Sequence, residues 1–193
     1  AHVLGKDVDT VGVSGPYLVP DLALVEKYSQ ALGTYGVRMK IGFCWSSGIR
    51  EYGIWIAEYG RRKSMHFDAL RPAAFIHKMS ISLQVGPERA QAEGLLIDVL
   101  PERPTWDDTA ALIANLDLVI TVDTAGAHLA GALGKPTWLM MQQDGASWHF
   151  MSERPGAPWN ERSPWYPSIR IFRQKKPGDW SDVVERVSKE LGP

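Results

Sequence analysis

Hydrophobic residues are gathered along the chain in short runs, and segments rich in polar residues, Gly or Pro separate each run from the next. Each run is too short for a buried helix and has the near-continuous apolar character of a strand that is covered on both faces. Six runs of this kind predict six strands, and they span residues 38–45, 79–86, 94–101, 116–123, 135–142 and 168–172.

The segments between these runs predict helices. Asp21 is a suitable N-cap for a first helix and Gly33 ends it, because Asp accepts bonds from free N–H groups and Gly adopts the left-handed conformation. Further helices are expected at 66–78, 87–93, 107–115, 124–133, 146–152 and 179–191. Strands that alternate with helices indicate a parallel sheet. The sequence therefore predicts an α/β fold with a doubly wound, six-stranded, Rossmann-like parallel sheet in the order 3-2-1-4-5-6.

Residues 1–20 are rich in Gly, Val and Pro, which favours extended and turn conformations over helix. We expect residues 1–36 to form an N-terminal connector and helix, and residues 37–193 to form the Rossmann-like domain. The chain begins with Ala1 instead of Met, which would follow for a processed chain or for a piece of a longer one, and the second possibility stays open.

Composition narrows the classes of protein to consider. A chain of 193 residues with 45% hydrophobic content can bury one sizeable core. The net charge of −1 argues against a nucleic-acid partner, because binding phosphate backbones needs a basic surface. The single cysteine, Cys44, excludes an internal disulfide and fits the reducing cytoplasm, where we expect the protein to work. No run has the ~20 apolar residues of a membrane span.

The stretch TVDTAGAHLAGALGKPTWLM, residues 121–140, joins a predicted strand to a helix of small residues. Asp123 or Thr124 is expected to cap this helix at the carboxyl edge of the sheet, where ligands of open parallel sheets bind. Gly126 and Gly131 each cost the helix roughly 0.5 to 1 kcal/mol relative to Ala, which indicates close packing or close approach of a ligand.

The first turn of this helix is a candidate anion site. Ala125 and Gly126 follow the cap, and free N–H groups with partial positive charge at a helix N-terminus suit a diphosphate. His128 lies on the same helix face as Thr124, within reach of a phosphate or a sugar hydroxyl. Two simpler interpretations stay open, in which Asp123 and Thr124 only cap the helix and His128 is only packed in its first turn.

A second candidate is the turn in GFCWSSG, residues 42–48, which ends the first strand at the same edge. Ser46, Ser47 and Gly48 can donate hydrogen bonds to a phosphate or a sugar. Ser and Gly also serve ordinary turns, so a purely structural role is the alternative.

Two polar segments complete the set of candidates. Arg61, Arg62 and Lys63 form a basic run on a loop that precedes a helix expected to start near Ser64, and such a run is either a solvated face or an anion contact. Asp107, Asp108 or Thr109 is expected to cap the helix at 107–115, and Asp108 with Thr109 is also placed to face a nucleoside.

Two stretches, LIANLDLVITVDTAGAHLAGALGKPTWLM and SPWYPSIRIFRQKKPGDW, resemble the C-terminal part of bacterial tetratricopeptide-repeat proteins whose last domain is similar to glycosyltransferases of the GT-B fold. They resemble the ADP-heptose heptosyltransferases more distantly. The similarity covers residues 37–192 and is strongest over 109–180. It implies that the predicted sheet corresponds to the C-terminal half of a GT-B glycosyltransferase, which is the half that binds the nucleotide sugar.

The resemblance also implies roles for the candidate residues. In these families the Asp-Thr turn and its helix contact the diphosphate of a nucleotide sugar, and a basic residue helps to neutralise the leaving diphosphate. We favour Lys63 for that second role. Heptosyltransferases have Asp-Thr-Gly at this turn, whereas this chain has Asp-Thr-Ala-Gly. The expected substrate-binding residues are Ser46, Ser47, Gly48, Arg62, Lys63, Asp108, Asp123, Thr124, Ala125, Gly126 and His128.

The favoured function is binding of the nucleotide-sugar donor in a GT-B-like glycosyltransferase, with metal-independent transfer once the domain is joined to an acceptor domain. No cofactor or metal is expected, and no residue is assigned as the base. An N-terminal acceptor or repeat domain in the parent polypeptide is the expected protein partner.

Two alternatives are weighed against this function. One is a non-catalytic interaction or scaffold module that kept the fold, which the inserted Ala favours. The other, a nicotinamide-binding enzyme, is disfavoured because GFCWSSGIREYG lacks the Gly-x-Gly-x-x-Gly spacing.

Overall fold

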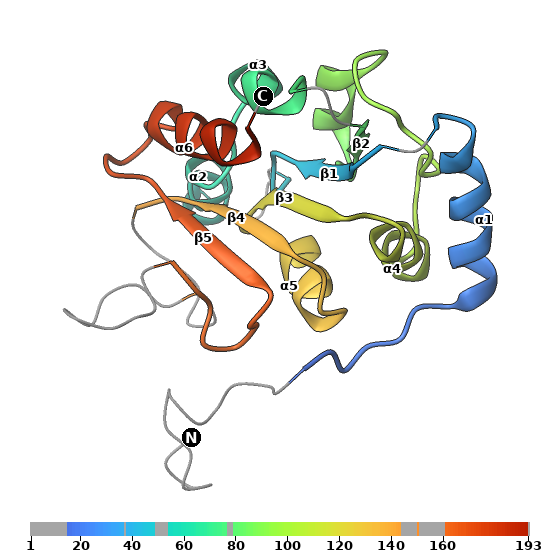
Figure 1. Ribbon diagram of the computed structural model, residues 1–193. Coiled ribbons are helices and arrows are strands. Elements are labelled where there is room, and N and C mark those ends of the chain that lie inside the picture. Colours follow the sequence, from blue (N-terminus) through green and yellow to red (C-terminus); the bar gives the residue numbers. More distant parts are fainter. Residues whose placement is uncertain are drawn as a thin grey trace, which may run out of the picture.

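The computed structural model describes residues 15–36, 38–48, 54–76, 79–143, 150 and 161–192. Its centre is a five-stranded sheet in the order β2-β1-β3-β4-β5 (Figure 1). Every neighbouring pair of strands is parallel, and Gly42 of β1 pairs with Ile81 on one side and Val119 on the other. The strands are β1 (Lys40–Cys44), β2 (Met79–Ser82), β3 (Leu118–Val122), β4 (Thr137–Met141) and β5 (Ile169–Arg173).

Helices cover both faces of this sheet, so the predicted α/β class and parallel sheet are confirmed. In Figure 1, α3 and α6 lie over one face, α4 and α5 lie under the other, and α1 packs on the outside of α4. The helices are α1 (Leu22–Gly33), α2 (Ile54–Arg62), α3 (Phe67–Ala74), the 3-10 helix η2 (Pro87–Ala92), α4 (Trp106–Ala114), α5 (Ala125–Ala132) and α6 (Ser181–Leu191).

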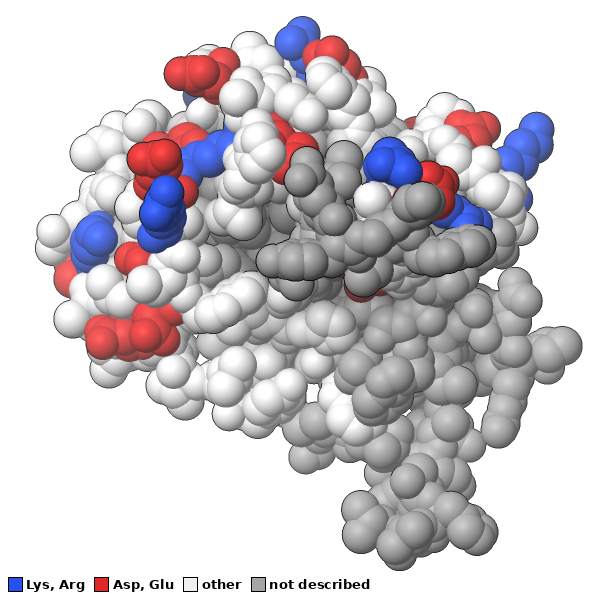
Figure 2. Space-filling view, turned by 180° about the vertical axis from the view of Figure 1, so that it is seen from behind, with Lys and Arg blue, Asp and Glu red and all other residues white. Residues whose placement is uncertain are grey.

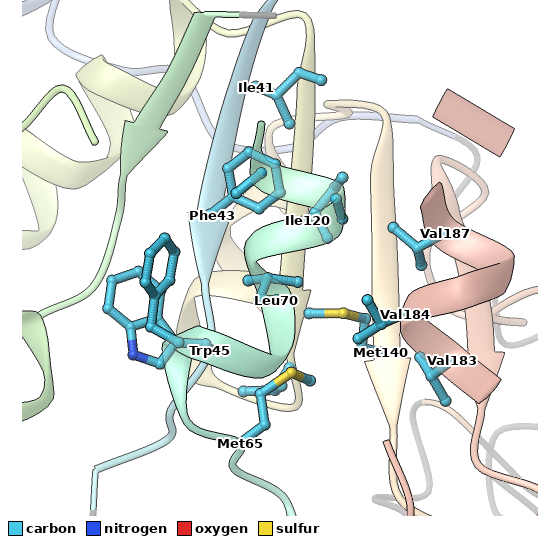
Figure 3. Close-up of a cluster of buried hydrophobic side chains, with 14 of the residues drawn as sticks. Ile41, Phe43, Trp45, Met65, Leu70, Ile120, Met140, Val183, Val184 and Val187 are labelled. Carbon is cyan, nitrogen blue, oxygen red and sulfur yellow. The ribbon is translucent and has the colours of Figure 1, made fainter. Parts of the chain in front are cut away.

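Alternate side chains of the strands point to opposite faces, and the core divides accordingly. Ile41 and Phe43 of β1 join Leu70 of α3 and Val184 of α6 in one buried cluster (Figure 3). The alternate positions of β1, Gly42 and Cys44, face the side of the sheet that α4 covers. Glycine is required at position 42, because an added Cβ would collide with Leu116 and Leu83. Close packing on both faces fixes the carboxyl edge of the sheet in place.

The prediction of a strand at 94–101 was wrong, because the described residues form five strands and not six. Ile97 makes a single parallel bridge to Ile81 on the outer side of β2. The pairing does not continue, because Gln84 N, the donor that a longer parallel pairing with Val99 would use, donates to the Ser82 hydroxyl at 3.3 Å. The bridge nevertheless lies at the edge where the predicted strand order placed this segment.

Several helix ends also differ from the expectation. The helix expected from Ser64 starts at Phe67, with His66 as N-cap, and ends at Ala74 instead of residue 78. Residues 54–62 form α2 where a loop was expected, and Glu58 and Arg61 pair along it at 3.0 Å. The helix expected at 146–152 lies outside the described residues, apart from residue 150.

The two ends of the first helix are confirmed, whereas the cap of α4 was predicted wrongly. Asp21 accepts bonds from Ala23 N and Leu24 N at 2.8 and 3.1 Å, and α1 ends at Gly33. The cap of α4 is Thr105, in place of the three residues expected.

The charge of the surface and the length of the helices are relevant to two classes of partner, nucleic acids and membranes. Among the described residues on the face seen in Figure 2, Lys and Arg side chains are interspersed with Asp and Glu, without an extended basic region. Within the described part of the chain, no helix is both long and apolar enough to span a membrane.

Candidate functional site

A pocket of about 380 Å³ opens at the carboxyl ends of β1 and β3. The strand order reverses between these two strands, since β1 leads to β2 on one side and β3 lies on the other. Ligands of open parallel sheets bind at such a reversal point. The residues that line the pocket come from the turn after β1, the segment after β2, the start of α4 and the start of α5, and include Cys44, Ser46, Ser47, Gly48, Gln84, Val85, Pro87, Glu88, Thr105, Trp106, Thr121, Thr124, Ala125 and Gly126.

The turn after β1 is held on its inner side by Gln84, which lies two residues beyond β2. The side-chain oxygen of Gln84 accepts bonds from Trp45 N at 3.0 Å and Ser46 N at 2.9 Å. Its amide nitrogen donates to Ser46 O at 3.1 Å. Gln84 is almost completely buried, so this wall of the pocket is fixed from below.

Ser64, just beyond α2, holds the same turn from the other side. Its hydroxyl oxygen accepts a bond from Ser47 N at 3.0 Å, and its O–H donates to Gly60 O at 2.7 Å. Gly48 N donates to the Ser46 hydroxyl at 3.3 Å. The N–H groups of residues 45–48 therefore all have partners within the protein, and Ser46, Ser47 and Gly48 contribute pocket surface with few open donors.

The turn after β3 is built differently. Thr124 is the N-cap residue of α5 in an extended conformation, with φ −135° and ψ 167°, but its side chain makes no cap hydrogen bond within the described residues. Its hydroxyl lies 3.2 Å from the Thr121 hydroxyl. The N–H groups of Ala125 and Gly126 precede the first intrahelical bond, which Ala127 N makes to Thr124 O, and both residues line the pocket.

Asp123 and Lys63 pair beside this turn, outside the pocket lining. Lys63 Nζ lies 3.8 Å from Asp123 Oδ2, and the Asp123 side chain is only 6% exposed. The Tyr59 hydroxyl donates to the same oxygen at 3.5 Å. Burial, followed by the negative charge of Asp123, raises the pKa of Tyr59. Lys63 thus compensates a buried carboxylate next to the first turn of α5.

Asp108 does not line the pocket. Its carboxylate and the Thr105 side chain form a capping box at the start of α4. The Tyr28 hydroxyl of α1 donates to Asp108 Oδ1 at 2.8 Å. Burial, together with this bond, raises the pKa of Tyr28 to about 12, and the bonds from Thr105 lower the pKa of Asp108. Asp108 therefore ties α1 to α4.

His128 and Arg62 also lie outside the pocket lining. His128 Nδ1 lies 3.1 Å from the Tyr166 hydroxyl, and its ring packs 4.8 Å from the ring of Phe150. Arg62 is exposed at the end of α2. The structure thus brings Ser46, Ser47, Gly48, Thr124, Ala125 and Gly126 together and leaves the other five candidates around them.

Two residues of the pocket that could contact a ligand were not predicted from the sequence. Glu88 lines it, and one of its carboxylate oxygens is buried without a hydrogen-bond partner among the described residues. Trp106 stands at the mouth and is 61% exposed. Gly86, with φ 82°, turns the chain after β2 so that Glu88 faces the pocket. A Gly-Pro-Glu sequence after an apolar run was the available signal for this turn.

Within the described part of the chain, no group of three or more His, Cys, Asp and Glu side chains is close enough to hold a metal ion.

Comparison with known proteins adds to this geometry. The family described as glycosyltransferase family 9 (heptosyltransferase) matches residues 83–138, which include Glu88 and the turn at Thr124. Protein FlbA of Caulobacter vibrioides is 37% identical over 108 residues, a stretch that covers 56% of this chain and 16% of FlbA.

Two solved structures share the fold. E. coli ADP-heptose LPS heptosyltransferase II aligns with a TM-score of 0.62 and 17% identity, over 91% of this chain and 52% of its own. A glycosyl transferase of family 9 from Veillonella parvula aligns with a TM-score of 0.61 and 13% identity, over 92% and 53%. The chain thus spans about half the length of these structures. Its segment 83–138 matches glycosyltransferase family 9, and its parallel α/β fold is that of the heptosyltransferases.

Proposed function

We propose that the pocket binds the nucleoside diphosphate part of a nucleotide sugar, and that the chain is the donor-binding half of a GT-B-like glycosyltransferase. The observation that carries the proposal is the position of the pocket at the reversal point between β1 and β3, with the first turn of α5 on its wall. The family 9 match and the fold of the two solved structures support it.

The charges around the pocket suit a ligand with one anionic and one neutral end. The N–H groups of Ala125 and Gly126 and the N-terminal end of the α5 dipole attract a diphosphate. The unbonded carboxylate oxygen of Glu88 would repel a phosphate and accept hydrogen bonds from a hydroxyl or amino group. The diphosphate therefore fits at α5, and the nucleoside fits toward Glu88 and Trp106.

Sugar transfer needs the departing diphosphate to be stabilised. The first turn of α5 would serve this charge directly, and Lys63, 3.8 Å from Asp123, is a cation that can contact a phosphate at the same turn. In this proposal transfer is independent of metal. The acceptor contacts and the base come from an N-terminal acceptor or repeat domain of the parent polypeptide.

Calorimetric titration with ADP, CDP, GDP and UDP, and with the four matching nucleosides, tests the donor site. At least one diphosphate should bind, and it should bind more tightly than its own nucleoside, because the α5 turn recognises phosphate. The absence of binding by all four diphosphates would overturn the proposal.

A non-catalytic interaction module is the second candidate function. It is favoured by the turn after β1, whose N–H groups are all bonded within the protein, and by Lys63, which is engaged by Asp123. Crystals soaked with the four diphosphates distinguish the candidates. Density at the first turn of α5 supports donor binding, whereas an empty turn in a soaked, open lattice supports the module.

A further inference from the structure

The side chain of Gln84 makes five hydrogen bonds at the base of the pocket. Its oxygen accepts from the Cys44 thiol at 3.5 Å, Trp45 N at 3.0 Å and Ser46 N at 2.9 Å. Its nitrogen donates to Ser46 O at 3.1 Å and Val85 O at 3.0 Å. With 1% of Gln84 exposed, water cannot replace these partners.

This arrangement needs an amide. Backbone N–H groups only donate and backbone carbonyls only accept, so the oxygen of Gln84 must face Trp45 N and Ser46 N, and its nitrogen must face Ser46 O and Val85 O. A carboxylate at this position would set a negative oxygen against the two carbonyl oxygens. An aliphatic side chain would leave the buried Trp45 N and Ser46 N without these partners, and it would leave Ser46 O with only the weak bond from the Cys44 thiol.

We propose that Gln84 is a positioning residue, which holds the turn at residues 45–48 in the conformation that leaves the pocket open to a nucleoside diphosphate. This inference rests on the proposed function and names the residue that prepares its site. Gln84, Ser46, Ser47 and Gly48 all line the pocket, so any movement of the turn changes the space next to the first turn of α5. A wall formed before the ligand arrives avoids the cost of ordering it on binding.

Gln91 provides a matched control. Its side-chain oxygen accepts bonds from Trp45 Nε1 at 3.1 Å and Phe67 N at 2.9 Å, so it ties the same tryptophan to the start of α3. Gln91 does not line the pocket and makes no recorded bond to the backbone of the 45–48 turn within the described residues. A Gln91 variant therefore loses a partly buried amide that holds the same tryptophan, without releasing the turn.

Cys44 reports on the turn without any ligand. It is the single cysteine of the chain, it lines the pocket, and its thiol lies within hydrogen-bond distance of Gln84 Oε1 and of Ser46 O. Burial raises the pKa of this thiol and slows its reaction. Native labelling with iodoacetamide should be about tenfold faster in Gln84→Leu and within about twofold of the wild-type rate in Gln91→Leu. Equal rates in Gln84→Leu and the wild type, or equal increases in both variants, would overturn the inference.

Gln84→Glu keeps the inference testable where Gln84→Leu does not fold. Burial raises the pKa of a carboxyl group, and the protonated group regains one donor for Ser46 O or Val85 O. The labelling rate, divided by the wild-type rate at the same pH, should therefore fall as the pH is lowered from about 8 to about 5.5. Cys44 and Glu88, the titratable groups near this side chain, are common to both proteins. A ratio that does not change with pH contradicts a role for the amide.

Ligand binding completes the test with the tightest binder among ADP, CDP, GDP and UDP. Gln84→Leu should weaken its affinity about tenfold, and Gln91→Leu should change it by less than about twofold. Unchanged affinity in a Gln84→Leu protein that labels rapidly overturns the inference while the proposed function stands. If the wild type binds none of the four, the proposed function fails, and the labelling rates still decide whether Gln84 holds the turn.

Discussion

Two turns border the same pocket, and they use their backbone N–H groups in opposite ways. In the turn after β1, Gln84, Ser64 and the Ser46 hydroxyl accept the N–H groups of residues 45–48. In the turn after β3, Thr124 occupies the cap position but makes no side-chain cap bond within the described residues. The first turn uses its N–H groups within the protein, whereas Ala125 N and Gly126 N in the second have no recorded partner among the described residues.

The difference distinguishes a turn that shapes the pocket from a turn that can bind a ligand. A turn whose N–H groups are satisfied keeps its conformation in the empty protein and forms a wall. The N–H groups of Ala125 and Gly126, for which no bond is recorded in the described part of the chain, can donate to water or to a ligand, and the helix dipole favours an anion. The sequence SSG after β1 resembles a phosphate loop in composition, yet the structure gives the stronger case to the turn at Thr124.

Replacing Ala125 by Pro tests this contrast with the largest expected effect. Proline is tolerated at the first position of a helix, and Thr124 already has the extended conformation that precedes proline. The change removes one open N–H, and a hydrogen bond to a charged group is worth about 1.5 to 3 kcal/mol, so diphosphate affinity should fall about tenfold or more. Calorimetry with the diphosphate and its nucleoside measures the loss.

Nucleoside affinity and the melting temperature are the controls for Ala125→Pro. Both should stay near the wild-type values, because the nucleoside fits away from α5 and the helix keeps its geometry. A folded variant that binds the diphosphate normally would show that the donors of α5 are not used.

Gly131→Leu tests whether the other end of α5 is pressed onto the sheet. A Cβ at Gly131 would lie 2.6 Å from the ring of Tyr166, so a larger side chain must displace that ring. Overpacking should lower the free energy of unfolding by about 1 to 3 kcal/mol, as measured by chemical denaturation. Gly126→Ala is the matched variant, since its Cβ would meet only the Thr124 hydroxyl at 3.3 Å. Equal losses in both variants would mean that Gly131 is not in a special position.

Lys63→Met tests the proposed cation, and it needs Asp123→Asn as background. Removing Lys63 alone leaves the buried Asp123 carboxylate unpaired, which destabilises the fold whatever the ligand does. In the Asp123→Asn background that penalty is absent, and adding Lys63→Met should weaken diphosphate binding about tenfold. If the affinities of the single and double variants agree, Lys63 serves only the ion pair.

Much of the fold could be predicted because its signals are local. Near-continuous apolar runs indicated all five strands, and Asp21 and Gly33 bounded α1 correctly. The strand expected at 94–101 is reduced to one bridge at Ile97, because Gln84 N, which a longer pairing would use, donates to the Ser82 hydroxyl instead. No pattern of residues within this run predicts where the pairing stops.

The site was predictable in part for the same reason. Thr124 to Gly126 follow from a strand, a cap and a helix in sequence, and the pocket contains them. The Thr-x-x-Asp signature at Thr105 and Asp108 was available for the cap of α4. The role of Gln84 could not be predicted, because in the sequence it is one more position of an apolar run. Only the fold places it beneath the neighbouring turn. Long-range hydrogen bonds assign such residues, and spacing does not.

Ser47→Ala carries the smallest expected effect and is the sharpest control on the contrast between the turns. The Ser47 hydroxyl lies 3.4 Å from both Gly60 O and the Ser64 hydroxyl, so it makes only long, weak contacts with these two groups of the protein. The backbone N–H of Ser47 keeps its bond to Ser64 in the variant. Diphosphate affinity should therefore change by about twofold or less, in line with the small effects of substitutions that leave no buried group unpaired. A loss as large as that expected for Ala125→Pro would mean that the ligand opens the first turn and bonds to it, and that both turns hold the phosphate.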